Sequence, residues 1–210
     1  MKTTILTIIA LAIGFMGFAQ YGRIELNTGG FSPVPAFSDS QPNLVFAAGT
    51  NTGKKLSAHL IGNIRVEGKY LRSAIFITQY QIINKRFKMS IATHLPVIQI
   101  SEDFLADSFF AQELRTSFEI NETSSIGLQY VHGKGLNNDT EIHLVSLSHN
   151  LRSGKFNFHT QLYRVDLENT WGLAERINYQ LSDRFYLAGF YNKGIGGSSD
   201  LSTLGLGYTL

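Results

Sequence analysis

The 210-residue chain contains no cysteine and only four prolines. The absence of cysteine excludes a disulfide scaffold, a thiolate metal site and a thiol nucleophile. Charged residues are also scarce, at 16% of the chain, whereas roughly 25% is usual in soluble domains. The formal net charge of +2 gives no argument for a nucleic-acid partner. The length is sufficient for one domain with a core of its own.

The one long apolar run of the chain lies at its N-terminus. Lys2 precedes this nearly continuous apolar stretch. The small residues Gly17 and Ala19 follow it and suit cleavage between Ala19 and Gln20. This order of basic, apolar and small residues predicts a secretory signal peptide over residues 1–19. The alternative is an uncleaved anchor helix, but the run is shorter than the ~20 residues that span a bilayer.

The rest of the chain is rich in alternating segments. From about residue 54, stretches of about 9–13 residues alternate in hydrophobicity with period two. They are separated by clusters of Asn, Gly, Asp, Ser and Lys. Successive side chains of a strand point to opposite faces, so this pattern predicts β-strands. We therefore expect one all-β domain over residues 20–210.

The gaps between these segments alternate in length. Short gaps fall near Asn84–Lys85 and Arg152–Gly154, and longer ones near Ser101–Ser108 and Gly133–Asp139. Short turns on one side and longer loops on the other are typical of outer-membrane barrels, whose tilted strands have this length. With a first strand at Gly22–Asn27 the count is twelve, and ten is the fallback. We predict a closed antiparallel transmembrane β-barrel with its C-terminus on the periplasmic side.

The distribution of charge favours a membrane barrel over the alternative, a soluble barrel or sandwich. One face of nearly every segment carries Phe, Tyr, Leu and Met, and the opposite face carries Arg, Glu, His and Asn. Several ionised groups would be costly in a dry core but not in a wet lumen. Glu175 is the exception, because its parity places it with Leu173 and Ile177 toward lipid. Either a bulge re-aims it or the register differs there.

The C-terminal segment LSTLGLGYTL ends on an apolar residue, with an aromatic residue third from the end. Together with the N-terminal segment and the repeated strands, it resembles small Gram-negative outer-membrane β-barrel proteins. The ending Phe18-Ala19-Gln20 of the N-terminal segment resembles signals common in Bacteroidota. The resemblance implies residence in the cell outer membrane and contact with its lipid. It also implies that the barrel-assembly machinery reads the strand with Leu204, Leu206, Tyr208 and Leu210. The departure is Leu210, where Phe is usual in such proteins.

Thirteen polar side chains are expected to face the lumen, with six basic residues against two acidic ones. They are His59, Asn63, Arg65, Arg86, Lys88, His94, Glu113, Arg115, Glu119, Gln129, Lys155, His159 and Arg176. Hairpin symmetry brings some of them to similar depths. It predicts one patch of His94, Glu113, Arg115 and Gln129, with His94 roughly opposite Glu113. A second patch contains His159 and Arg176.

Three functions remain open for this polar lumen. The groups could satisfy one another in a structural envelope barrel, or line a narrow channel that favours small anionic solutes. A binding or accessory subunit of a larger envelope or secretion complex is a further rival for the protein as a whole. The third is a lipid-modifying enzyme with His94 as base, Glu113 as its orienter and Ser90 as nucleophile. Ser90 and His94 are about 13 Å apart along an extended strand, so we expect no enzymatic activity and no catalytic residue.

The sequence predicts no cofactor and no metal site. The six histidines show no metal-ligand spacing, since His143 and His149 share a face but are too far apart along the strand for one ion. The glycine-rich stretch at 194–200 follows a strand but opens no helix, so it is interpreted as a loop and not as a phosphate-binding turn.

Overall fold

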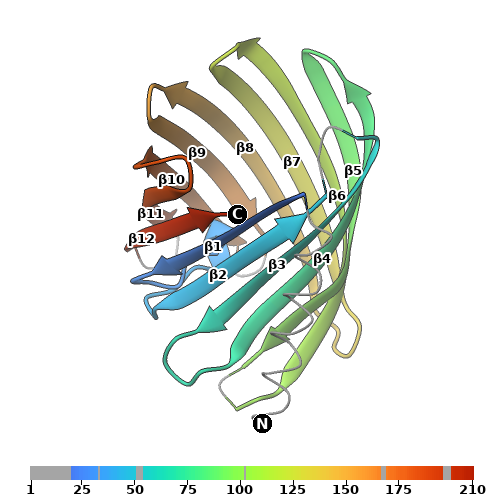
Figure 1. Ribbon diagram of the computed structural model, residues 1–210. Coiled ribbons are helices and arrows are strands. Elements are labelled where there is room, and N and C mark those ends of the chain that lie inside the picture. The colour runs from blue at the N-terminus through green and yellow to red at the C-terminus, as the bar shows by residue number, and fades with distance from the viewer. Residues whose placement is uncertain (1–19, 33, 51–53, 102, 167–168, 196–199) are drawn as a thin grey trace.

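A computed structural model describes residues 20–32, 34–50, 54–101, 103–166, 169–195 and 200–210. The predicted signal peptide, residues 1–19, lies outside the described residues. The described residues form twelve strands in one closed antiparallel barrel (Figure 1), in which β1 pairs with β12 to complete the ring. The prediction of a twelve-strand antiparallel barrel is therefore confirmed. Among the described residues, no helix is long and apolar enough to cross a membrane.

The strands are longest in the part of the wall formed by β4 to β8. Their bounds are β1 Tyr21–Asn27, β2 Asn43–Gly49, β3 Leu56–Arg65, β4 Leu71–Asn84, β5 Phe87–Ile100, β6 Ala106–Asn121, β7 Ser124–Gly135, β8 Glu141–Ser153, β9 Phe156–Val165, β10 Thr170–Gln180, β11 Phe185–Ile195 and β12 Leu201–Thr209. A short 3-10 helix, η1 (Pro35–Phe37), lies in the loop between β1 and β2.

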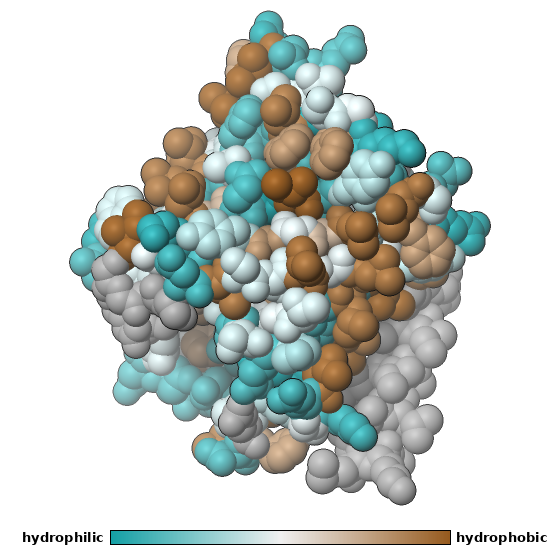
Figure 2. All heavy atoms as spheres, turned by 90° about the vertical axis from the view of Figure 1, so that its left-hand side faces the viewer, coloured by the Kyte–Doolittle hydropathy of each residue, from teal (hydrophilic) through white to brown (hydrophobic). Residues whose placement is uncertain are grey.

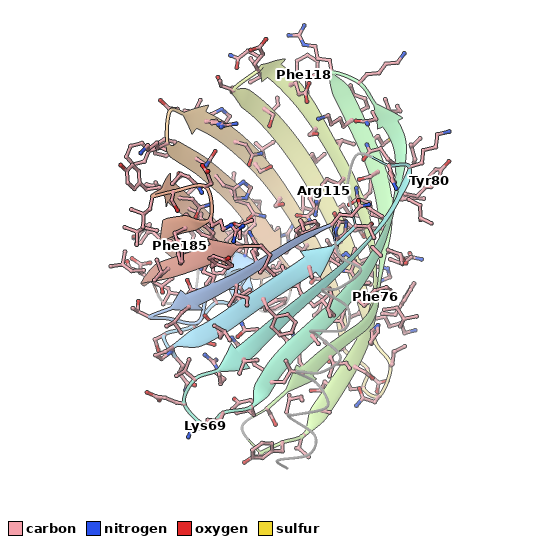
Figure 3. The ribbon with its side chains drawn as sticks, viewed as in Figure 1. Lys69, Phe76, Tyr80, Arg115, Phe118 and Phe185 are labelled. Carbon is pink, nitrogen blue, oxygen red and sulfur yellow. The ribbon has the colours of Figure 1, made fainter. Side chains whose placement is uncertain are left out.

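The two ends of the barrel differ in the length of their connections. Residues 85–86, 122–123 and 154–155 form tight turns at the end of the barrel where β1 begins and β12 finishes. The opposite end carries longer loops, of which residues 28–42 between β1 and β2 form the longest. Lys69 and Phe118 mark the long-loop end and the short-turn end in Figure 3. In outer-membrane barrels the short turns are periplasmic and the long loops extracellular.

The apolar face of the sheet points outward. Leu128 and Leu147, near the middle of β7 and β8, are 50% and 53% exposed, whereas Ser146 beside Leu147 is 2% exposed. Figure 2 shows brown hydrophobic side chains mixed with white ones over one outer face, with hydrophilic side chains toward its upper and lower ends. A water-soluble barrel would have the opposite arrangement, since exposing this many large apolar side chains to water is unfavourable. The outer surface is therefore suited to hydrocarbon.

A bulge in β5 changes one predicted facing. His94 pairs with Ala111 and Val97 with Phe109, so two residues of β5 oppose one of β6. The extra residue shifts the alternation by one and brings Val97 to the inner face beside Phe109. Strict alternation along β5 would place Val97 with Leu95 on the outer apolar face, and the bulge reverses that facing.

Glu175 does face outward. The pairings of β10 with β9 and β11 run without a register shift, so no bulge re-aims this residue. The hydroxyl of Thr160 on β9 donates to Glu175 Oε2 at 2.5 Å. The carboxylate borders a shallow hollow of about 480 Å³ in the outer wall at Gly189. Glu175 therefore stays on the outer face, and the hydrogen bond from Thr160 stabilises its carboxylate there.

Replacing Leu147 by Arg tests the assignment of the outer face. The residue lies at the middle of β8, and a guanidinium there would have to enter the hydrocarbon. We expect the free energy of unfolding in lipid vesicles to fall by about 2–4 kcal/mol. Leu136→Arg is the control, because Leu136 is 59% exposed in the loop between β7 and β8 and should change stability by less than about 0.5 kcal/mol. Equal effects of the two substitutions in urea titrations would contradict a lipid-facing β8.

Candidate functional site

The first predicted patch is assembled around Glu113 on β6. His94 Nε2 lies 2.9 Å from Glu113 Oε2, and Arg115 Nη2 lies 2.7 Å from Glu113 Oε1. Gln129 on β7 is the direct cross-strand partner of Arg115 and also contacts the hydroxyl of Ser146 at 3.3 Å. His94 reaches Glu113 diagonally, because the residue directly opposite Glu113 is Ala92. All four predicted residues thus lie together on the inner wall.

The second predicted patch contains an ion pair that the prediction did not include. His159 and Arg176 are direct partners across β9 and β10, as hairpin symmetry indicates. Arg176 Nη2 donates to Glu25 Oε2 at 2.5 Å, and the Tyr186 hydroxyl donates to the same oxygen at 2.7 Å. His159 Nδ1 lies 2.7 Å from Asn150 Oδ1. The centre of this patch is a buried ion pair between β1 and β10.

Other members of the predicted lumen set have different positions. Arg86 is exposed at the β4–β5 turn and donates to the backbone carbonyls of Glu119 and Ile120. Lys155 lies in the β8–β9 turn. Lys88 and Glu119 form an ion pair at 2.5 Å, and both side chains are more than 40% exposed. The predicted excess of basic groups inside the barrel is therefore smaller than the sequence count.

The loop between β1 and β2, residues 28–42, folds into the barrel and is here called L1. Phe31 is 7% exposed and packs edge-on against Phe190 of β11 with ring centroids 5.0 Å apart. The Arg176 guanidinium lies 4.3 Å from the centroid of the Phe31 ring. The same apolar cluster includes residues from β2 and from β8 to β10, namely Val45, Leu144, Tyr163, Val165 and Ala174. L1 therefore narrows the lumen at the long-loop end.

Polar contacts fix L1 to strands on either side of the β1–β12 pair. Asn43 and Asn63 donate their side-chain amides to the Phe31 carbonyl at 2.8 and 3.3 Å. Asn192 on β11 donates to the Pro35 carbonyl at 3.2 Å. L1 therefore contacts β2 and β3 on one side of the β1–β12 pair and β11 on the other, and it is held as a strap and not as a free surface loop.

An ionic cluster completes the attachment of L1. Asp39 lies between two arginines. Arg65 donates to it through both Nη1 and Nη2, and Arg72 Nη1 is 2.5 Å from Asp39 Oδ2. Partial burial raises the pKa of Asp39, but the hydrogen bonds from Arg65 and the Gln41 backbone and the charge of Arg72 outweigh it. The net effect is a pKa below the usual 3.8. Asp39 is therefore ionised wherever the barrel is folded at neutral or mildly acidic pH.

Two acidic residues of this interior were missed by the sequence analysis. Tyr21, Arg23, Glu25 and Asn27 alternate with apolar residues in the first strand, so parity alone could have placed Glu25 inside. Nothing comparable marks Asp39, because L1 has no periodic pattern and its position depends on contacts with strands far along the chain. Glu25 and Asp39 neutralise part of the basic surplus.

The fold defined by these features is that of an outer-membrane-type porin barrel. No protein-family model matches the chain, and no curated protein sequence is recognisably similar to it. Solved structures do match. A KdgM porin superposes with a TM-score of 0.66 at 6% identity, and a NanC porin with 0.59 at 11% identity. Each match covers 90% of this chain and 97% of the porin. At such low identity the likeness establishes the fold alone.

Removing one partner of the Glu25–Arg176 pair should be strongly destabilising. Both side chains are less than 10% exposed, and Arg176→Met leaves the carboxylate buried without its charge partner. We expect a loss of about 3–5 kcal/mol in the free energy of unfolding. Lys88→Met is the matched control, because its exposed pair with Glu119 should contribute at most about 1 kcal/mol. Urea titration in vesicles measures both, and a smaller loss in Arg176→Met than in Lys88→Met would contradict the buried pair.

The charge on Asp39 predicts how the attachment of L1 depends on pH. A depressed pKa means that the stabilisation is present above the unfolded value of about 3.8 and is lost as pH falls through the lower folded value. Conductance in planar bilayers should therefore be constant from pH 7 to 5 and rise only below about pH 3.8. Asp39→Asn should already conduct more at pH 7, because its amide cannot pair ionically with Arg65 and Arg72. A rise between pH 7 and 5 in the wild type would contradict this assignment.

Proposed function

We propose that the protein is a narrow outer-membrane channel for small anionic solutes, with L1 as its constriction. The observation that carries the proposal is a charged lumen inside an apolar wall. Arg115 projects into this interior and its side chain remains 51% exposed, and Figure 3 places it within the outline of the barrel. A fixed guanidinium in a narrow passage lowers the electrostatic barrier for anions.

The polar atoms of the interior support a hydrated lumen. Among the described side chains, several buried donors and acceptors have no hydrogen-bond partner in the protein, including Glu25 Oε1, Arg176 Nη1 and Asn178 Oδ1. A buried polar group left unsatisfied costs about 1–3 kcal/mol. These atoms belong to side chains of the inner wall, so only water that enters between those side chains can satisfy them. A dry, fully packed barrel would leave the cost uncompensated.

The structural neighbours make acidic oligosaccharides a reasonable solute class. One of the KdgM porin structures is a complex with disordered oligogalacturonate, which is an anionic oligosaccharide. That ligand belongs to the neighbour and is carried here as analogy only. The present lumen is less basic than its sequence count suggests, because Glu25, Asp39 and Glu113 each pair with an arginine. We therefore expect modest anion preference and small solutes.

A closed structural barrel is the second candidate, and L1 is the observation that favours it. The strap fills the long-loop end with an apolar cluster and is fixed to several strands. If L1 never moves, the charges below it serve only to stabilise the wall. Conductance of the wild type decides between a constricted channel and this closed form.

An enzymatic role is not proposed. The His94–Glu113 contact has the geometry of a base and its orienter, at 2.9 Å. The candidate nucleophile Ser90 is four residues before His94 on β5, which corresponds to about 13 Å along a strand. The solved structures to which the fold is similar are porins. A lipid-modifying activity that disappears in His94→Ala would overturn this view.

The location and assembly of the barrel belong to the same proposal. We place the mature chain in the outer membrane after cleavage between Ala19 and Gln20. Leu204 and Leu206 of β12 face outward, at 69% and 50% exposure, and the Tyr208 ring packs beside Phe185 with centroids 4.9 Å apart. An outward apolar face on the last strand is accessible to the assembly machinery before the barrel closes against β1.

Releasing L1 should enlarge the conductance. Phe31→Ala removes the ring between Arg176 and Phe190, and we expect the single-channel conductance to rise at least about twofold. Phe104→Ala is the control, because Phe104 is 56% exposed in the β5–β6 loop at the same end of the barrel. Planar-bilayer recordings measure both variants. If wild type and Phe31→Ala both fail to conduct while folded, the channel is excluded and the structural barrel remains.

Reversing the charge of Arg115 should reverse or abolish anion preference. We expect Arg115→Glu to lower the anion-to-cation permeability ratio by about two- to tenfold, measured as the reversal potential in a salt gradient. Arg164→Glu changes the net charge equally, but Arg164 lies on the outer face over Trp171. The same shift in both variants would mean that surface charge and not the lumen sets selectivity.

A further inference from the structure

A group of potential metal ligands lies outside the lumen, on the outer face of β7 and β8. His132 and His143 are direct cross-strand partners, and Glu141 lies two residues before His143. Their positions share the parity of Tyr130 and Val145, which are 40% and 45% exposed. The three residues therefore point away from the channel at the long-loop end of the barrel.

The ligand atoms of these three residues already converge. His132 Nε2 lies 2.7 Å from Glu141 Oε1, and His143 Nε2 lies 3.6 Å from the same oxygen. The two imidazole rings are nearly parallel, with centroids 4.7 Å apart. All three ligand atoms lie within 4.8 Å of one another. Ligands of one tetrahedral Zn²⁺ are about 3.3 Å apart, so small side-chain rotations would suffice.

A contact with Tyr130 orients the ring of His143. The Tyr130 hydroxyl lies 2.8 Å from His143 Nδ1. With Nδ1 protonated, this N–H donates to the tyrosine oxygen and Nε2 keeps its lone pair facing Glu141. Metal-ligating histidines are commonly held this way through their other ring nitrogen. The contact is therefore compatible with the tautomer that leaves the Nε2 lone pair free for a metal ion.

Asp166 supplies a fourth potential ligand beside the group. Its Oδ1 accepts the backbone N–H of His143 at 2.7 Å, and its Oδ2 is 4.0 Å from His143 Nε2. The side chain is thus fixed to β8 and within reach of a shared ion. Two imidazoles with one or two carboxylates form a donor set typical of Zn²⁺ and related ions, not of Mg²⁺ or Ca²⁺, which prefer oxygen alone.

We propose that His132, Glu141 and His143, with Asp166 at the fourth position, form a binding site for a first-row transition metal ion such as Zn²⁺. The site joins β7, β8 and the start of the β9–β10 loop at the outer rim. It is independent of the lumen, because its side chains point to the opposite face of the same strands. Bound metal would clamp three adjacent parts of the wall.

The direct test is a Zn²⁺ titration of the folded, mature barrel in detergent, purified without a polyhistidine tag. We expect one ion per chain by calorimetry. His143→Gln should weaken binding by about 100-fold, and Tyr130→Phe by about tenfold because only the orienting contact is lost. Heat-dependent migration on SDS gels verifies that each variant is folded. Visible absorption of bound Co²⁺, lost in His143→Gln, reports the ligand set independently of affinity.

His149→Gln is the matched control. His149 shares the outer face of β8 with His143 but lies six residues nearer the short-turn end, in contact with the Ser124 hydroxyl at 3.0 Å. We expect its Zn²⁺ affinity to equal that of the wild type. The proposal is overturned if His132→Gln and His143→Gln bind as the wild type does, if His149→Gln loses affinity equally, or if Ca²⁺ competes at equal concentration. None of these measurements depends on conductance, so the metal site can be confirmed or excluded independently of the proposed channel function.

Discussion

The pairing of β1 with β12 is the contact on which the rest of the structure depends. Five residue pairs join the two strands, and without them two rows of backbone N–H and C=O groups would face hydrocarbon unsatisfied. Closure also brings Glu25 on β1 within reach of Tyr186 and Arg176, far along the chain. The Glu25–Arg176 ion pair is thus a consequence of ring closure. The position of L1 depends on closure too, because L1 follows β1 and its Phe31 ring packs against Arg176.

The interior contains charge in a form that is locally compensated. Asp39 is held by two arginines, Glu113 by His94 and Arg115, and Glu25 by Arg176. Compensation stabilises the wall, because a lone charge in a partly buried position would be costly. It also limits selectivity, since a solute meets pairs rather than bare cations. Arg115 is the group that combines pairing with exposure, and L1 determines whether solutes reach it.

The two faces of the wall carry separate chemistry, because alternate residues of each strand point in opposite directions. On β7, Gln129 belongs to the lumen patch. His132, in contrast, belongs to the group of potential metal ligands at the outer rim, here called the rim group (His132, Glu141, His143 and Asp166). The metal-ligand candidates were not found in the sequence because His132 and His143 are eleven positions apart and become neighbours only through the β7–β8 register. Spacing along a single strand, such as that between His143 and His149, does not reveal a ligand on the strand beside it.

The sequence by itself determined the alternation, the twelve strands, the inversion of polar and apolar faces and the pairing of Arg115 with Gln129 and of His159 with Arg176. These follow from local rules, because period-two patterns and tight turns set hairpin register between neighbours in the chain. Only the tertiary structure decided the facing of Val97, the Glu25–Arg176 pair, the insertion of L1 and the rim group of histidines. Each depends on a bulge, on closure of the ring or on contacts across the lumen, and such long-range geometry leaves no periodic trace in the sequence.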